Sequence, residues 1–140
     1  MTLAPLELPR AAVNRLLAAA QASPDEEVCG FVVRDGNDCV ILPVRNISTE
    51  PTCRFEMDPA GMVEAFRHAR DDGEEILAIY HSHPSGPPFP SALDQELAYY
   101  PDLPYLVISL GTRGVLELRA FHLGHEGRIE RTLRLVDAAG

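Results

Sequence analysis

Two stretches of the chain carry apolar residues at helical spacing. The first runs from Arg10 to Ala22, where apolar positions recur at i, i+3, i+4 and i+7 as Val13, Leu16, Leu17 and Ala20. Pro24 stops it, because the residue before a proline is disfavoured in the helical region. The second begins with Asp58 as N-cap, followed by a proline, and ends at Gly73; its buried stripe consists of Met62, Phe66 and Ala69. Both patterns predict amphipathic helices that bury one face.

Runs of apolar and β-branched residues predict strands around these helices. The runs 28–33 and 39–44 flank an Asp-Gly-Asn turn and indicate a hairpin. Residues 74–80 are a nearly continuous apolar run, which is typical of a buried central strand. Further strands are expected at 53–57, 106–110, 115–122 and 128–136, with a short helix from Ser91 to about Tyr100. The order of elements predicts a single α/β domain over residues 1–140, with a mixed β-sheet flanked by helices.

The composition is that of an ordinary globular domain, with 140 residues, 46% of them hydrophobic and 24% charged. The formal net charge of −9 disfavours nucleic acid and anionic membranes as partners, because few cations are available to neutralise phosphates. No segment reads as a signal peptide or a transmembrane helix. The three cysteines lack CxxC spacing and predict neither a disulfide framework nor a cysteine zinc site. We therefore expect a cytoplasmic protein with reduced thiols, and a homodimer is compatible with the sequence.

The candidate chemistry lies in the stretch from His81 to Asp94. His81 and His83 stand at i and i+2 at the end of the predicted central strand, so their side chains point to the same face. A proline-rich loop follows, and Asp94 falls in the first turn of the helix that Ser91 opens. Imidazoles and a carboxylate are zinc ligands, and three protein ligands with one open position are typical of a catalytic zinc site.

Each half of this pattern also has a purely structural interpretation. Histidines are common at strand ends, and Ser91-x-x-Asp94 is a helix-capping pattern that favours an acid at the positive end of the helix dipole. The two halves nevertheless flank a short loop with four prolines, which restrict its backbone. A rigid connection between a strand end and a helix start favours three ligands that meet at one ion.

A hydrolytic zinc site also needs a general base outside the metal ligands. The candidate is Glu27, which stands at the start of a predicted strand beside Cys29 and Gly30. The alternative interpretation is a solvated acidic turn, because Asp25 and Glu26 precede it.

Together these segments resemble the signature of the JAMM (MPN-plus) metalloproteases, a glutamate followed by His-x-His and then by Ser-x-x-Asp. The corresponding segments here are Glu27-Val-Cys-Gly30, His81-Ser-His83-Pro84 and Ser91-x-x-Asp94, in that order. Residues 54–59 and 79–80 are also similar to the family, and the resemblance covers roughly residues 8–136. Non-catalytic members of the fold usually lack part of the ligand set, whereas this sequence has all of it.

The resemblance implies a cytidine-deaminase-like fold and one zinc ion per chain, held by His81, His83 and Asp94. It makes Glu27 the general base that takes a proton from zinc-bound water and later protonates the leaving amine. Glu27 is preferred to Glu26 because the glutamate of the family lies three residues before the Gly30 position. Ser91 is expected to hydrogen-bond the catalytic water or the developing oxyanion. The reaction implied is the hydrolysis of an amide or isopeptide bond.

The chain is close to a minimal core and looks like the compact prokaryotic branch of the family, whose members cut at the C-terminus of ubiquitin-like sulfur-carrier proteins. We therefore expect the Gly-Gly tail of a ubiquitin-like or sulfur-carrier protein as the partner, bound by strand addition beside the active site. The released group is expected to be an amino acid, such as cysteine, or a protein amine. The alternative is a non-catalytic MPN-type interaction scaffold, which the intact ligand set disfavours. Nucleoside deamination is disfavoured because its zinc form uses a Pro-Cys-x-x-Cys segment that this sequence lacks.

Overall fold

The computed structural model describes residues 4–36, 38–96, 100, 102–112, 115–124 and 127–137. The elements along the chain are β1 (Leu6–Pro9), α1 (Arg10–Gln21), β2 (Cys29–Asp35), β3 (Asp38–Val44), α2 (Pro59–Asp71), β4 (Glu75–His83), α3 (Ala92–Glu96), β5 (Tyr105–Thr112), β6 (Val115–Gly124), β7 (Gly127–Arg131) and β8 (Leu133–Val136). No helix within these described ranges is long and apolar enough to cross a membrane.

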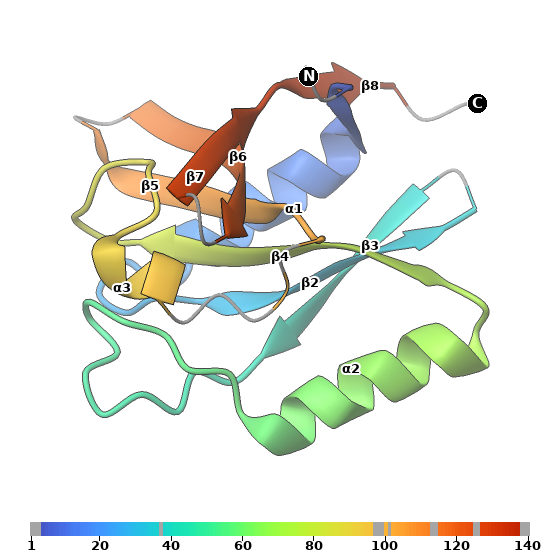
Figure 1. The fold of residues 1–140 in the computed structure, drawn as a ribbon, viewed down its shortest axis with the longest axis horizontal. Helices are drawn as coiled ribbons and strands as arrows, with labels where there is room; N and C mark the ends of the chain where they lie inside the picture. Colours follow the sequence, from blue (N-terminus) through green and yellow to red (C-terminus); the bar gives the residue numbers. More distant parts are fainter. Residues whose placement is uncertain are drawn as a thin grey trace.

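A mixed sheet in the order β3-β2-β4-β5-β6-β7 forms the centre of the molecule (Figure 1). Its neighbouring strands are antiparallel except β4 and β5, which run parallel and are connected through α3. β1 and β8 form a separate parallel pair that brings the two ends of the chain together, with Leu6 opposite Leu133. This arrangement confirms the predicted mixed sheet flanked by helices.

The helices α1 and α2 cover opposite faces of the sheet (Figure 1). Successive residues of β4 alternate between the two cores: Ala78 and Tyr80 pack on the side of α1, and Ile79 packs on the side of α2. His81 and His83 continue the alternation from Ile79, so both imidazoles lie on the α2 face at the end of the strand.

Both predicted long helices are confirmed, and the ends of α2 have the expected caps. The carboxylate of Asp58 accepts a hydrogen bond from the backbone N–H of Ala60 at 3.2 Å, and Pro59 occupies the first helical position. Gly73, just beyond the helix, has a φ of +67°, a conformation that glycine adopts without the strain caused by a Cβ atom.

The elements differ from the predicted ones in three places. β1 was not predicted, because four residues are too few to establish an alternating pattern. The strand expected at 53–57 is wrong: Cys53 ends a turn, residues 54–56 have no regular structure, and Met57 makes only an isolated bridge to Asn46. The strand expected at 128–136 is interrupted at Thr132, because β7 pairs with β6 whereas β8 pairs with β1. α3 begins where the helix was expected, and its predicted continuation through residues 97–99 lies outside the described residues.

Candidate active site

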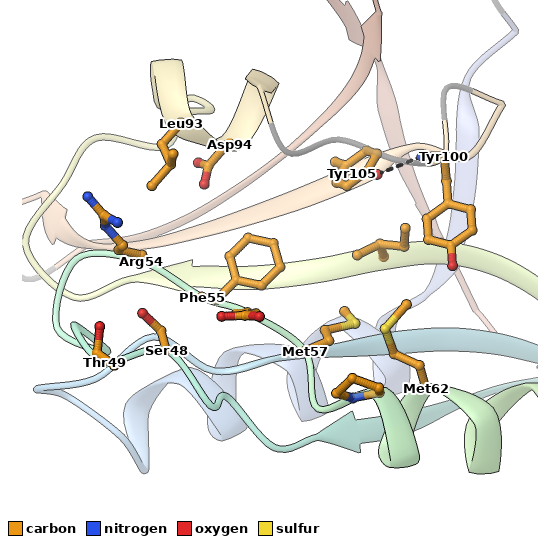
Figure 2. Close-up of a pocket in the computed structure, with 13 residues that line it drawn as sticks. Ser48, Thr49, Arg54, Phe55, Met57, Met62, Leu93, Asp94, Tyr100 and Tyr105 are labelled. Carbon is orange, nitrogen blue, oxygen red and sulfur yellow. Dashed lines mark hydrogen bonds between the residues drawn. The ribbon is translucent and has the colours of Figure 1, made fainter.

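The carboxyl end of β4 forms one wall of the candidate site. β4 and β5 are the parallel pair of the sheet, and ligands of α/β sheets bind where parallel strands end. His81 is fully buried there and His83 is 7% exposed. A cavity of about 480 Å³ opens beside this strand end and is bordered by Asp94 (Figure 2).

Glu27 reaches the same place from the start of β2. Cys29 pairs with His81 in the antiparallel ladder, so Glu27 lies opposite His83 when the register is continued. The ladder is extended by the Ser82 N–H, which donates to the Val28 carbonyl at 3.0 Å. Glu27 is 5% exposed, and its Oε1 atom is buried without a hydrogen-bond partner in the described part of the chain.

The structure therefore separates the two candidate glutamates. The carboxylate of Glu27 lies in a cluster with His81, His83 and Asp94, whereas Glu26 is exposed to solvent. The solvated acidic turn is an accurate description of Asp25 and Glu26, but not of Glu27.

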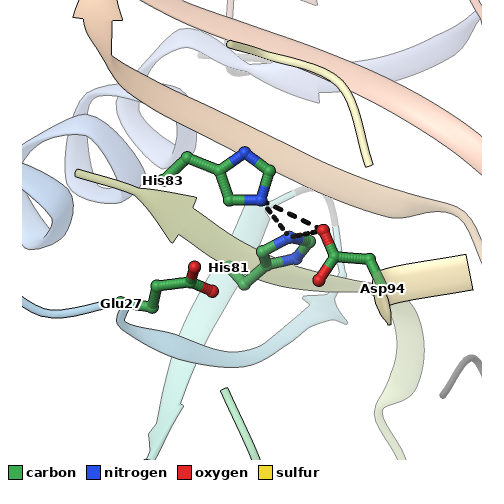
Figure 3. Close-up of side chains that lie close together, drawn as sticks. All are labelled: Glu27, His81, His83 and Asp94. Atoms are coloured by element: carbon green, nitrogen blue, oxygen red, sulfur yellow. Dashed lines mark hydrogen bonds and ion pairs between the residues drawn. The ribbon is translucent and has the colours of Figure 1, made fainter. Parts of the chain in front are cut away.

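Three predicted ligand atoms form a nearly equilateral triangle (Figure 3). The Nε2 atoms of His81 and His83 are 3.1 Å apart, and each lies 3.0 Å from Oδ2 of Asp94. In a tetrahedral zinc site with bonds of about 2.0–2.1 Å, neighbouring ligand atoms are separated by roughly 3.3–3.4 Å. The observed triangle is close to that size, and a carboxylate oxygen of Glu27 lies within 4.8 Å of all three atoms.

Asp94 is held in place by the start of α3. Its Oδ2 atom accepts a hydrogen bond from the Ser91 N–H at 2.8 Å, and its own N–H donates to the Ser91 hydroxyl oxygen at 3.0 Å. The Ser91 hydroxyl accepts in this arrangement, which leaves its hydrogen available to a substrate. The capping and metal-binding interpretations of Ser91-x-x-Asp94 are thus compatible in one geometry.

A hydrogen bond between His83 and the proline loop fixes which nitrogen of the imidazole carries the proton. Nδ1 of His83 lies 2.8 Å from the Pro87 carbonyl oxygen, which can only accept, so Nδ1 is the protonated atom. Neutral His83 consequently directs the lone pair of Nε2 toward Asp94. Lone pairs and a carboxylate that converge on one point are repulsive unless a cation or a shared proton lies between them, so the donor set fits a metal ion.

His81 is held by packing rather than by a second hydrogen bond. Phe55 stacks on its ring with centroids 4.5 Å apart and an interplanar angle of 22°. Its Nδ1 atom is buried and has no partner in the described part of the chain. Phe55 lies in the segment 54–59 that resembles the family, but the sequence assigned it no role.

The electrostatics of the cluster keep Asp94 ionised. Burial raises the pKa of Asp94, but His81 and His83 in their protonated forms and the Ser91 N–H lower it by more, and the result lies well below its usual range. Burial lowers the pKa of His81 more than Asp94 raises it. Burial also lowers the pKa of His83, but hydrogen bonds to Asp94 and Pro87 outweigh it and raise the net value.

Glu27 has the opposite behaviour to Asp94. Burial raises its pKa from 4.5 to about 7; His83 acts to lower it and Asp94 to raise it further. A carboxyl group with a pKa near neutrality can both accept and deliver a proton at physiological pH.

A single side chain that the sequence did not single out organises the loop around Glu27. The Asn46 amide donates to the carbonyls of Glu27 and Arg54, both at 3.0 Å. Its oxygen accepts from the N–H groups of Ser48 and Glu56, also at 3.0 Å. The Glu27 N–H donates to the Pro51 carbonyl at 2.7 Å, so the backbone of Glu27 is held from both sides.

The family model for prokaryotic homologs of the JAB domain matches residues 9–123. The chain belongs to this family. The match includes all five predicted site residues and most of the sheet, and it agrees with the JAMM resemblance that the same residues carry.

Two curated relatives of this prokaryotic JAB protein are named as hydrolases. A desampylase of Haloferax volcanii is 36% identical over 64% of this chain and 67% of its own length. A CysO-cysteine peptidase of Mycobacterium tuberculosis is 28% identical over 89% of this chain and 87% of its own length.

Solved structures share the fold. The solution structure of a protein from Desulfitobacterium hafniense has a TM-score of 0.82 and 32% identity, covering 94% of this chain and 92% of that one. A JAB1/MPN domain protein from Archaeoglobus fulgidus has a TM-score of 0.59 and 16% identity, covering 94% of this chain and 100% of that one. This prokaryotic JAB protein therefore has the predicted JAMM/MPN fold.

Proposed function

We propose that this chain is a zinc-dependent hydrolase that cleaves an amide or isopeptide bond at the C-terminal Gly-Gly tail of a ubiquitin-like or sulfur-carrier protein. The observation that carries the proposal is the convergence of three ligand atoms, 3.0–3.1 Å apart, beside a buried carboxyl group. The names of the relatives, a desampylase and a CysO-cysteine peptidase, support the same class of reaction.

Zinc fits the donor set better than a hard cation such as Mg²⁺, because two of the three ligand atoms are imidazole nitrogens. The proposed ligands are His81, His83 and Asp94. When bound, zinc supplies an acidified water and polarises the scissile carbonyl.

The remaining chemistry is assigned to two side chains. Glu27 accepts the proton of the attacking water, for which a pKa of about 7 is well suited, and delivers it to the departing amine nitrogen. Ser91 donates its hydroxyl hydrogen to the carbonyl oxygen as negative charge develops there. The products are the carboxylate of the tail and a free amine.

The tail of the substrate is proposed to lie in the cavity that Asp94 borders. Side chains from the segment 48–57 and from α2 form much of its lining, and several of them are apolar (Figure 2). β4 is paired on both sides, so the tail cannot add to β4 itself. Strand addition would have to use the backbone of the segment 48–57, which is the wall of this cavity.

The cytoplasm is the proposed compartment, because all three cysteines are unpaired and one of them, Cys53, is exposed.

The test is the release of an amine from a carrier protein that bears a C-terminal Gly-Gly amide adduct. We expect zinc-loaded protein to cleave it, chelator to abolish cleavage, and Glu27→Gln to retain about one zinc per chain but lose roughly 10²-fold to 10⁴-fold in kcat. Glu26→Gln, at the neighbouring exposed position, is the matched control and should retain activity. A dead Glu26→Gln beside an active Glu27→Gln would contradict the assigned base, and no zinc-dependent cleavage of any such carrier would contradict the function.

A further inference from the structure

A second cavity, of about 410 Å³, borders the same cluster of Glu27, His81, His83 and Asp94 through other members than the first cavity does. Glu27, His83 and Ser91 line this second cavity, and none of them lines the first. In the proposed reaction Glu27 delivers the proton to the leaving nitrogen. The leaving group must therefore occupy the cavity that Glu27 lines, with the Gly-Gly tail in the other.

Among the described residues that line the second cavity, Arg128, on β7, is the one with a permanent positive charge. Its guanidinium lies over the ring of Phe89, 4.9 Å from the centroid, and over Phe121 at 5.8 Å. Its one hydrogen bond within the described residues is a long one of 3.4 Å to the Pro90 carbonyl. Two aromatic rings thus hold the guanidinium in place while most of its donors stay unused.

A second arginine also lies over the ring of Phe89 and has ion pairs, so contact with this ring does not prevent an arginine from pairing with a carboxylate. Arg119 lies 5.0 Å from the centroid of Phe89, but it pairs with Glu117 at 3.5 Å and with Glu130 at 3.3 Å. Among the described residues no carboxylate forms an ion pair with Arg128, although the chain carries a net charge of −9. An arginine that lines a cavity and has no carboxylate partner among the described residues is suited to an anionic ligand.

The chemical structure of the possible leaving groups indicates which anion Arg128 would bind. In an amino acid released from a tail, one carbon separates the carboxylate from the amide nitrogen, so the carboxylate enters the cavity whenever the nitrogen lies beside Glu27. The side-chain amine of a lysine in a protein conjugate carries only methylene groups next to its nitrogen. A guanidinium binds a carboxylate through two parallel hydrogen bonds and gains nothing from methylene groups.

We propose that Arg128 binds the α-carboxylate of the leaving group, so that the physiological substrate is a carrier tail extended by a single amino acid. This inference rests on the proposed function, because it names the leaving group of that reaction. Water adds to the tail carbonyl, the C–N bond breaks, and the amino acid departs with the proton from Glu27 and its carboxylate on Arg128. Arg128 is a specificity-determining residue in this scheme and takes no part in bond breaking.

The experiment compares two adducts of one carrier that differ only at the end: Gly-Gly followed by one amino acid with a free carboxylate, or by the same amino acid as its carboxamide. We expect the zinc-loaded protein to prefer the carboxylate adduct in kcat/KM by about 10-fold to 100-fold. Arg128→Gln should remove this preference by raising KM much more for the carboxylate adduct than for the carboxamide adduct. Arg128→Lys should restore part of the preference, and Arg119→Gln should retain all of it.

A binding measurement separates this inference from the proposed function. The zinc-loaded Glu27→Gln protein should bind the carboxylate adduct more tightly than the carboxamide, and Arg128→Gln in that background should equalise the two. Preferential binding without turnover in the parent protein would contradict the proposed function and support the carboxylate site. If Arg128→Gln weakens the binding of both adducts equally, Arg128 acts through the packing of the proline loop and the inference is overturned. A preference of the parent protein for a lysine-linked conjugate would also overturn it.

Discussion

The carboxyl group of Glu27 is buried and poorly supplied with hydrogen bonds. Its Oε1 atom is buried without a partner in the described part of the chain, and burial raises its pKa from 4.5 to about 7. A carboxyl group whose pKa is higher in the folded protein than in the unfolded chain favours folding only while it is protonated. Its contribution is complete below pH 4.5 and is lost as the pH rises through about 7.

Glu27→Gln should therefore stabilise the metal-free protein, with an effect that depends on pH. At pH 4 the variant and the parent should unfold with nearly the same free energy, because the parent carboxyl is then neutral. Above pH 7 the variant should be more stable by about 3 kcal/mol, the cost of ionising a group with this difference in pKa. Urea denaturation of both proteins in chelator, from pH 4 to pH 8, measures the difference. Glu26→Gln, which is exposed, should show no such trend, and a constant offset for Glu27→Gln would contradict the role of burial.

The loop between β3 and α2 has little regular structure and depends on hydrogen bonds from a few side chains. Asn46 alone donates to two carbonyls and accepts from two N–H groups in this loop. One of those carbonyls belongs to Glu27, and Phe55 from the same loop covers His81. Order in the loop is thus coupled to the position of the proposed base and one proposed ligand.

Asn46→Asp tests this coupling, because it replaces the NH₂ group with an oxygen that faces two carbonyl oxygens. We expect a loss of about 2–3 kcal/mol in the free energy of unfolding, from two lost hydrogen bonds and the new repulsion. Activity should fall as well, because the backbone of Glu27 loses one of its two restraints. Asn14→Asp makes the same chemical change at an exposed position of α1 and should cost little. Equal stabilities of the two variants would show that the loop does not depend on Asn46.

At the scale of the whole molecule, the site is assembled from segments whose roles can be predicted from the sequence to different degrees. The segment 81–94 was predictable because a strand end, a short rigid loop and a helix start fix the relative positions of their side chains over a short distance in sequence. Glu27 needed the family resemblance, since its own surroundings read as a solvated turn. No sequence pattern indicated a role for Arg128, because only the strand order β4-β5-β6-β7 brings β7 toward the proline loop. The same limit explains β1 and β8, which are defined by pairing between the two ends of the chain.

The proposed metal joins two elements that are otherwise connected by the proline loop, so its binding should stabilise the entire fold. A ligand that binds only the native state adds about 2.7 kcal/mol at a free concentration 100 times its Kd, which for a domain of this size corresponds to roughly 10 °C in Tm. We expect zinc to raise the Tm by this order and chelator to reverse the shift. Asp94→Ala should abolish the shift, because it removes the oxygen that lies 3.0 Å from both imidazoles.

A second group of polar side chains, His68, Asp72 and Glu74 at the end of α2, supplies the control for this experiment. His68 lies 3.1 Å from Glu74 and 3.5 Å from Asp72, but it is considerably exposed, so the competition of water makes a stable metal site there unfavourable. His68→Ala should therefore keep the full zinc-dependent shift in Tm. If His68→Ala loses the shift and Asp94→Ala keeps it, zinc binds at the end of α2, and the assignment of the catalytic centre to the carboxyl end of β4 is wrong.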